Sequence, residues 1–115
     1  MKEFKRKINE DTSITYRLGT NSKENHQIID EADKDDWWFH LDGFPSGHCI
    51  IERIEIDYED IEFASEIVVR NSKLKNSKNV KICYTQVKNL KKTKNPGEVL
   101  LLKSPKIYYF KNTRV

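Results

Sequence analysis

The stretch Asp36-Trp-Trp-Phe-His-Leu-Asp-Gly-Phe-Pro-Ser-Gly-His48 decides how this chain folds, because it joins an aromatic strand to a tight turn. It contains both tryptophans and two of the three histidines of the chain. A strand over residues 37–42 would send alternate side chains to opposite faces. One face would be apolar, and the other would combine the side chains of Trp38, His40 and Asp42. The Pro45–Gly47 turn would then place His48 at the start of a second apolar run.

The rest of the chain alternates between strand and helix patterns. Period-two alternation predicts strands at residues 13–18, 49–54 and 80–85. Helical spacing predicts a helix at about 23–33 and a second at about 58–74, with Asp57 as the cap of the second. Two further runs, residues 98–102 and 106–110, predict a hairpin hinged at Ser104–Pro105. The predicted fold class is therefore α+β, a single domain with a largely antiparallel sheet and two helices.

The length of 115 residues predicts one domain, which we place at residues 13–111. Residues 1–12 have few apolar anchors and are expected to be a flexible N-terminus, either frayed or a weak edge strand. No apolar run approaches the roughly 20 residues of a membrane span, and the basic start does not resemble a secretory signal. The lone cysteines, Cys49 and Cys83, are typical of buried thiols in a reducing compartment. These features together predict a cytoplasmic protein without membrane contact.

The net charge of +3 conceals an uneven distribution. Residues 1–60 hold 8 Lys or Arg and 15 Asp or Glu, whereas residues 61–115 hold 13 Lys or Arg and 3 acids. No acid occurs between Glu66 and Glu98, although nine Lys or Arg do. This asymmetry indicates a polyanionic partner. Lys88, Lys91 and Lys92 are the natural phosphate contacts in this stretch.

The residues of the Trp/His stretch allow both binding and catalytic interpretations. An indole beside an imidazole, as in Trp38 and His40, suits stacking of bases, although aromatic residues at period two more often pack in a core. A hydrolase would have to use His40, His48 and Asp42. The spacing of the histidines matches no known zinc cluster, and Ser46 beside His48 lacks the strand-turn-helix elbow of a serine nucleophile. We therefore expect neither metal nor cofactor, and no enzymatic activity.

Three motifs resemble the NFACT-R domain: Gly19-Thr-Asn-Ser-Lys-Glu-Asn25, Asp36-x-Trp38-Phe-His40 and Pro45-Ser-Gly-His48. The order and spacing continue through Ala64, Ser72, the strand at 80–85, the lysines at 88–92 and Gly97-x-Val99, so the resemblance covers residues 14 to about 110. Two positions depart from the family pattern. Thr20 stands where the family has arginine, and Ser46-Gly47 inverts the family's Gly-Ser order.

The resemblance implies a non-enzymatic RNA-binding module of proteins in ribosome-associated quality control, here in its stand-alone form. The implied partner is RNA, either tRNA or rRNA with DNA not excluded, together with the ribosome or quality-control factors. The alternatives are the hydrolase and a protein-binding adaptor of the translation machinery. Carried over by position, and with Arg17 in place of the missing arginine, the nucleic-acid-binding residues would be Arg17, Asn21, Asn25, Trp38, His40, Ser46, His48, Lys88, Lys91 and Lys92.

Overall fold

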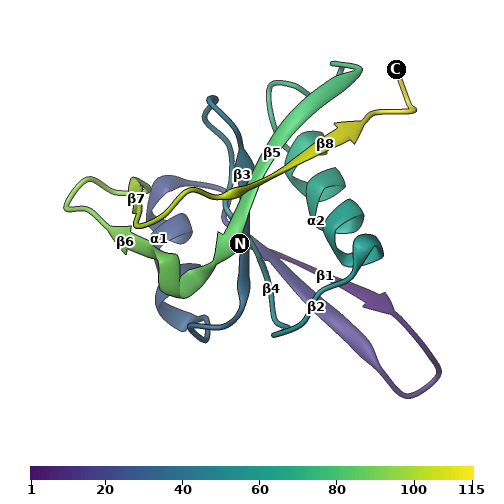
Figure 1. The fold of residues 1–115 in the computed structure, drawn as a ribbon, viewed down its shortest axis with the longest axis horizontal. Coiled ribbons are helices and arrows are strands. Elements are labelled where there is room, and N and C mark those ends of the chain that lie inside the picture. The colour runs from purple at the N-terminus through teal and green to yellow at the C-terminus, as the bar shows by residue number, and fades with distance from the viewer.

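The computed structural model describes residues 1–115 (Figure 1). The Trp/His stretch forms strand β3 (Trp37–Leu41), which lies inside a six-stranded sheet. The strand order is β1-β2-β4-β3-β5-β8, and every neighbouring pair is antiparallel. The other strands of this sheet are β1 (Lys2–Lys7), β2 (Ser13–Leu18), β4 (Cys49–Ile51), β5 (Asn79–Gln86) and β8 (Lys106–Lys111). With two α-helices, this sheet confirms the predicted α+β class.

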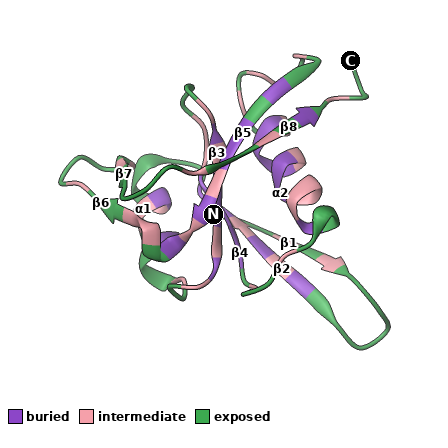
Figure 2. Cartoon of the chain, in the orientation of Figure 1, coloured by how far each residue is buried: buried purple, intermediate pink, exposed green.

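The side chains of β3 alternate as predicted, but both faces of the strand are covered. Phe39 and Leu41 pack with helix α2 (Tyr58–Arg70) in a cluster of 14 buried residues. Trp38 points the other way and packs with Ile28 of helix α1 (Ser22–Glu31) in a second cluster of six. The buried segments therefore lie along the centre of the sheet and on the inner sides of the helices (Figure 2). At Trp38 this face of the strand is thus part of a core, whereas His40 on the same face is partly exposed.

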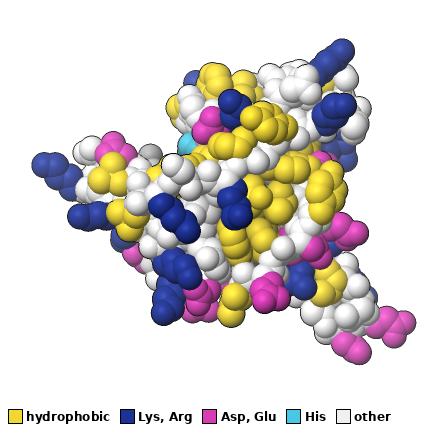
Figure 3. All heavy atoms as spheres, viewed as in Figure 1, with side chains coloured by type: hydrophobic (Ala, Val, Ile, Leu, Met, Phe, Trp, Pro, Cys, Tyr) yellow, Lys and Arg dark blue, Asp and Glu magenta, His cyan; other side chains and the backbone are white.

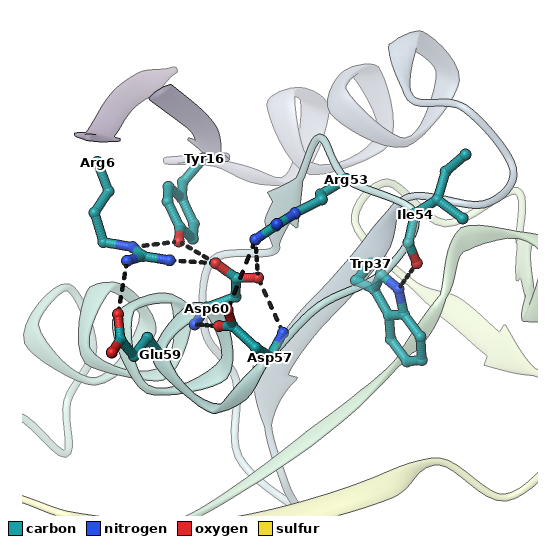
Figure 4. Close-up of polar contacts among 8 residues, drawn as sticks. All are labelled: Arg6, Tyr16, Trp37, Arg53, Ile54, Asp57, Glu59 and Asp60. Carbon is teal, nitrogen blue, oxygen red and sulfur yellow. Dashed lines mark hydrogen bonds and ion pairs between the residues drawn. The ribbon is translucent and has the colours of Figure 1, made fainter. Parts of the chain in front are cut away.

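Both helices begin at the caps that their sequences provide. Asp57 and Asp60 form a reciprocal capping box at the start of α2, and Asn21 accepts a hydrogen bond from the Glu24 amide at the start of α1. The fully buried Asp60 carboxylate also pairs with Arg6 of β1 and with Arg53, whose Nη1 lies 2.8 Å away (Figure 4). Two guanidinium groups therefore compensate one buried charge and fasten the edge strand to α2.

The predicted hairpin near the C-terminus is wrong. Strand β7 (Val99–Leu101) pairs with β6 (Leu90–Lys92) in a separate two-stranded ribbon, while β8 pairs with β5 at the sheet edge. A short 3-10 helix, η1 (Val87–Asn89), leads from β5 into the ribbon. The ribbon forms because Leu90 and Val99 pack together against the α1 cluster, a site that a partnership with β8 would not reach. Segment 102–105 is then a crossover back to the sheet.

The N-terminal segment occupies an edge of the sheet. Lys2–Lys7 pair with β2 at six positions, which is the second of the two alternatives for this segment, while its flexibility stays a prediction. Cys49 and Cys83 are buried and free, as expected. No helix has the length and apolar character needed to cross a membrane.

Candidate nucleic-acid interface

Two glycine turns meet at the start of α1, and their backbones touch. The Gly19 amide donates a hydrogen bond to the His48 carbonyl (3.0 Å), and the His48 amide donates to Oδ1 of Asn25 (3.0 Å). A Cβ at Gly19 would lie 2.1 Å from Asn25 Oδ1, and a Cβ at Gly47 would lie 2.5 Å from the Gly19 carbonyl oxygen. Both positions therefore require glycine for close approach. The structure thus brings the first and third motifs of the sequence into direct contact.

A polar hollow of about 720 Å³ opens beside this contact. It is bounded by the start of α1, the Pro45–Gly47 turn, the start of β1 and the segment that follows α2. Its single hydrophobic lining residue is Leu18, and no acidic residue lines it. Three cations face it, Lys2, Lys73 and Lys75, which we call the hollow lysines. This hollow is therefore suited to an anion.

Asn21, Asn25 and Ser46 line the hollow as predicted, and each also has a structural bond. Asn21 caps α1 and Asn25 holds the His48 amide. Ser46 Oγ accepts a hydrogen bond from the Leu41 amide (3.1 Å) and donates to the Gly47 carbonyl (3.0 Å). Two of these side chains are partly or fully exposed to solvent, whereas Asn25 is buried. Asn21 and Ser46 are thus the members of this group that a ligand can reach.

Trp38 and His48 form the buried support under the two turns. Each is only 2% exposed, and Trp38 Nε1 donates a hydrogen bond to His48 Nδ1 (3.1 Å). Burial, together with the neighbouring His40 and His26, lowers the pKa of His48 to about 3. The neutral ring can therefore accept from the indole at Nδ1, with the proton on Nε2 facing the Gly97 backbone. Both residues line the inner wall of the hollow beside His40, but with 2% exposure they offer little surface to a ligand. This burial favours a role in positioning the turns, and direct contact with bases stays a prediction.

His40 remains partly accessible. Its ring stacks on Trp38 (centroids 5.5 Å apart, planes at 12°) and meets His48 edge-on at 4.9 Å. His40 Nδ1 donates to the Leu41 carbonyl (2.6 Å), and burial lowers the pKa of this imidazole. The ring lines a second hollow of about 410 Å³, whose walls include Phe44 and Leu101. The outer face of His40 is thus available to a ligand, and Trp38 supports it from behind.

The two hollows are linked into one groove. A smaller hollow of about 270 Å³ shares Ser22, Asn25 and Ser46 with the lysine-lined hollow, and it shares His40 and Glu98 with the second. The loop of the β6–β7 ribbon forms the outer wall, where the Glu98 carbonyl lies 2.9 Å from His26 Nε2 of α1. The groove therefore runs from a cationic end to a partly apolar end.

The other predicted cations lie outside this groove. Arg17, on β2, is paired with Glu52, and its Nε lies 2.7 Å from Glu52 Oε1. Lys88 Nζ is 3.1 Å from Asp35 Oδ1, and Lys92 pairs with Asp30. The expectation of an unneutralised patch is wrong for these lysines, because acids from α1 and the segment after it fold against them. Lys91 is exposed on β6. We call Lys88, Lys91 and Lys92 the ribbon lysines.

Sequence reasoning missed the hollow lysines as site residues. Lys2 belongs to the segment that the sequence predicts to be flexible, and Lys73 and Lys75 lie at the end of the predicted second helix. Ser72, which also lines the hollow, matched the order of the family motifs and was the available signal. Asn71 and Lys73, which flank Ser72 in the chain, line the hollow with it.

The geometry offers little to a hydrolase. The Ser46 hydroxyl donates to a backbone carbonyl, and His48 Nδ1 is occupied by the Trp38 indole. A general base must lie within hydrogen-bond reach of the proton that it removes. The structure also contains no group of three or more His, Cys, Asp or Glu side chains arranged to hold a metal ion.

Comparisons with known proteins agree with the motifs. The NFACT protein RNA binding domain matches residues 3–103. The Rqc2 homolog RqcH of Bacillus subtilis (strain 168) is 34% identical over 82 residues, which is 70% of this chain but 14% of RqcH. The structure of the C-terminal of the fibronectin/fibrinogen-binding protein from Streptococcus suis superimposes with a TM-score of 0.80 at 25% identity, and the match covers 87% of this chain and 41% of that one. This chain belongs to the NFACT RNA-binding domain family.

Proposed function

We propose that this domain binds RNA in the groove, without catalysing a reaction. The observation that carries the proposal is that three lysines and no acid line the hollow in which two of the family motifs meet. Phosphate groups would lie at the hollow lysines, where the positive end of the α1 dipole adds to the attraction. The Asn21 and Ser46 side chains, at the rim, would hydrogen-bond to phosphate or ribose.

The opposite end of the groove is suited to a base. The accessible face of His40, together with the exposed ring of Phe44, offers two aromatic surfaces beside a hollow of about 410 Å³. Protein contacts to single-stranded RNA commonly combine phosphate-binding cations with aromatic stacking of unpaired bases. An unpaired nucleotide would thus span the groove, with its phosphate at the lysine end and its base near His40.

The cellular setting is part of the same proposal. Domains of this family occur in proteins of ribosome-associated quality control. We therefore expect the bound RNA to be tRNA or rRNA, and the protein to act in the cytoplasm. Recognition by phosphate contacts and stacking would tolerate many sequences, because every base has an aromatic face.

The direct test is a binding titration with a fluorescent single-stranded RNA of about 12 nucleotides, which is long enough to span a groove of this kind. The triple variant Lys2→Ala/Lys73→Ala/Lys75→Ala should bind at least about tenfold more weakly than the wild type, because three phosphate contacts are lost. The matched control Lys7→Ala/Lys103→Ala/Lys111→Ala removes the same charge from exposed positions outside the groove. Equal weakening of both variants would show that only net charge matters.

A single substitution tests the base end. His40→Ala removes the accessible ring, and it should weaken RNA binding by several-fold, in the range of about 1 kcal/mol for one stacked base. Binding of an abasic oligonucleotide should be the same for His40→Ala and for the wild type. If His40→Ala weakens binding of both oligonucleotides equally, the ring does not stack on a base.

A further inference from the structure

A second exposed surface lies on the other face of the sheet. Trp37, Tyr84 and Tyr108 project on the α2 side, where the helix leaves part of the sheet uncovered, and Ile54 and Tyr58 adjoin them. Ile54 is 62% exposed and Tyr58 is 67% exposed. These five residues form what we call the aromatic face. Figure 3 shows hydrophobic side chains gathered in this region, between β8 and the start of α2.

Specific contacts hold the four rings of the aromatic face in place. The rings of Trp37 and Tyr84 are 5.9 Å apart, and those of Tyr58 and Tyr108 are 6.0 Å apart. Trp37 Nε1 donates to the Ile54 carbonyl at 2.7 Å (Figure 4). The Tyr108 hydroxyl lies 2.6 Å from a Glu62 carboxylate oxygen, to which it donates. Rings that are already oriented lose little entropy when a partner packs on them.

The charge around the aromatic face is acidic. Residues 52–62 hold six acids and one arginine. The buried carboxylate of Asp60 is matched by two arginines, and Glu59 is paired with Arg6. Glu55, which is exposed beside Ile54, and Glu62, which contacts the Tyr108 hydroxyl, have no ion-pair partner. One lysine, Lys106, adjoins the face opposite Tyr84, which leaves the acids in excess. Such a rim repels RNA phosphates and attracts Lys and Arg side chains.

We propose that the aromatic face is a docking site for a basic, amphipathic protein segment. Its apolar side chains would pack on the rings, because aromatic residues are enriched at the centres of protein interfaces. Its lysines or arginines would meet Glu55 and Glu62 at the rim of the face. None of the five residues lines the groove, so the site does not depend on the proposed RNA binding. One domain could then hold RNA on one face of its sheet and a protein on the other.

The test uses a synthetic amphipathic peptide of about 18 leucines and lysines, with leucine at helical spacing. Its binding is followed by NMR on the isotope-labelled full chain. We expect binding with amide shifts concentrated at residues 37, 54–58, 84 and 108. Two comparison peptides, one with scrambled order and the same charge and one with glutamate in place of lysine, should bind at least about tenfold more weakly. Shifts centred elsewhere, or equal binding of the glutamate peptide, would overturn the proposal.

Two variants complete the experiment. Ile54→Ser/Tyr58→Ser changes two side chains that are more than half exposed, and it should weaken binding of the amphipathic peptide by at least about tenfold. The control Ile8→Ser/Tyr109→Ser alters exposed side chains outside the aromatic face and should bind the peptide like the wild type. Both variants should bind RNA like the wild type. A first variant that keeps its peptide affinity would overturn the proposal.

Discussion

The hollow lysines and the ribbon lysines are equal in number and differ in their surroundings. The hollow lysines come from segments far apart in the sequence, and no acid lines the space that they face. The ribbon lysines are close together in the sequence, yet two of the three are paired with Asp30 and Asp35. A run of lysines in a sequence therefore shows only where positive charge is carried. Whether that charge is free depends on which acids the fold brings beside it.

The two groups of lysines are also supported by different parts of the structure. The hollow is built on glycine turns, a buried asparagine and the buried Trp38–His48 pair. The ribbon is a two-stranded element whose Leu90 and Val99 pack on the α1 cluster. Damage to the buried framework should therefore affect RNA binding in the hollow, while the ribbon lysines keep their ion pairs. This difference leads to three expectations, the first with the largest effect.

Acid should weaken the framework of the hollow through His48. Burial lowers the pKa of His48 to about 3, so the unfolded chain, with a pKa near 6.5, binds more protons between these values. Stability from this group is therefore complete above pH 6.5 and is lost as the pH falls toward 3. The expected loss in the free energy of unfolding between pH 7 and pH 4 is roughly 3 kcal/mol.

Urea unfolding at several pH values would measure this loss. The variant His48→Gln keeps an acceptor for the Trp38 indole but cannot gain a proton in this range, so its stability should depend less on pH. His40 and the buried Asp36 also titrate in acid and are common to both proteins. Parallel curves for the two proteins would mean that His48 does not supply the difference.

Gly47→Ala should separate the two turns. The added Cβ would lie 2.5 Å from the Gly19 carbonyl oxygen and 2.9 Å from Leu18 Cδ1, so the backbone must move. Overpacking of this kind typically costs about 1–3 kcal/mol. We expect this loss in thermal or urea unfolding, together with weaker RNA binding. Gly43→Ala is the comparison, because Gly43 has a positive φ of 79° and nothing within 4 Å of the added Cβ.

The two glycine variants therefore separate steric contact from backbone strain. Gly43→Ala should lose about 1–2 kcal/mol through strain alone and retain contact between the two turns. RNA affinity measured well below the melting temperature should fall more for Gly47→Ala than for Gly43→Ala, which adds a methyl group at the base end of the groove. Unchanged affinity in Gly47→Ala would show that the turn contact is unimportant for the groove.

The smallest expected effect comes from freeing the ribbon lysines. Asp30→Ala/Asp35→Ala removes the acids that pair with Lys92 and Lys88. Exposed ion pairs contribute little to stability, so the melting temperature should change only slightly. RNA affinity should rise a few-fold at low salt, because two masked cations become available. A decrease in affinity would show that the paired arrangement itself is used in binding.

Local patterns predicted the elements whose partners are close in sequence or whose caps are explicit. Alternation gave β3, and Asp57 gave the start of α2. The expected end of α2 at residue 74 overshot, because Asn71 caps the helix while Lys73 and Lys75 continue the charge pattern beyond it. The strand pairing near the C-terminus failed since both candidate partners of β7 have suitable patterns. The choice is made by packing against α1, which no local pattern reports.

The candidate site was predicted in part. The family motifs identified Asn21, Asn25, Ser46 and His40, all of which line the groove. They could not distinguish a contact residue from a support, because that difference depends on burial by α1, as Trp38 shows. Lys2 was missed because it reaches the hollow only when β1 pairs with β2, and the few apolar residues at the start of the chain do not predict that pairing.

The most direct test of the central claim is the salt dependence of RNA binding for the two lysine groups. For a single-stranded RNA, the logarithm of the association constant falls with the logarithm of the salt concentration by about 0.7 per phosphate contact. Lys2→Ala/Lys73→Ala/Lys75→Ala should reduce this slope by roughly 2, and Lys88→Ala/Lys91→Ala/Lys92→Ala should reduce it by about 0.7 or less. A larger reduction in the second variant than in the first would contradict the assignment of the groove as the RNA-binding site.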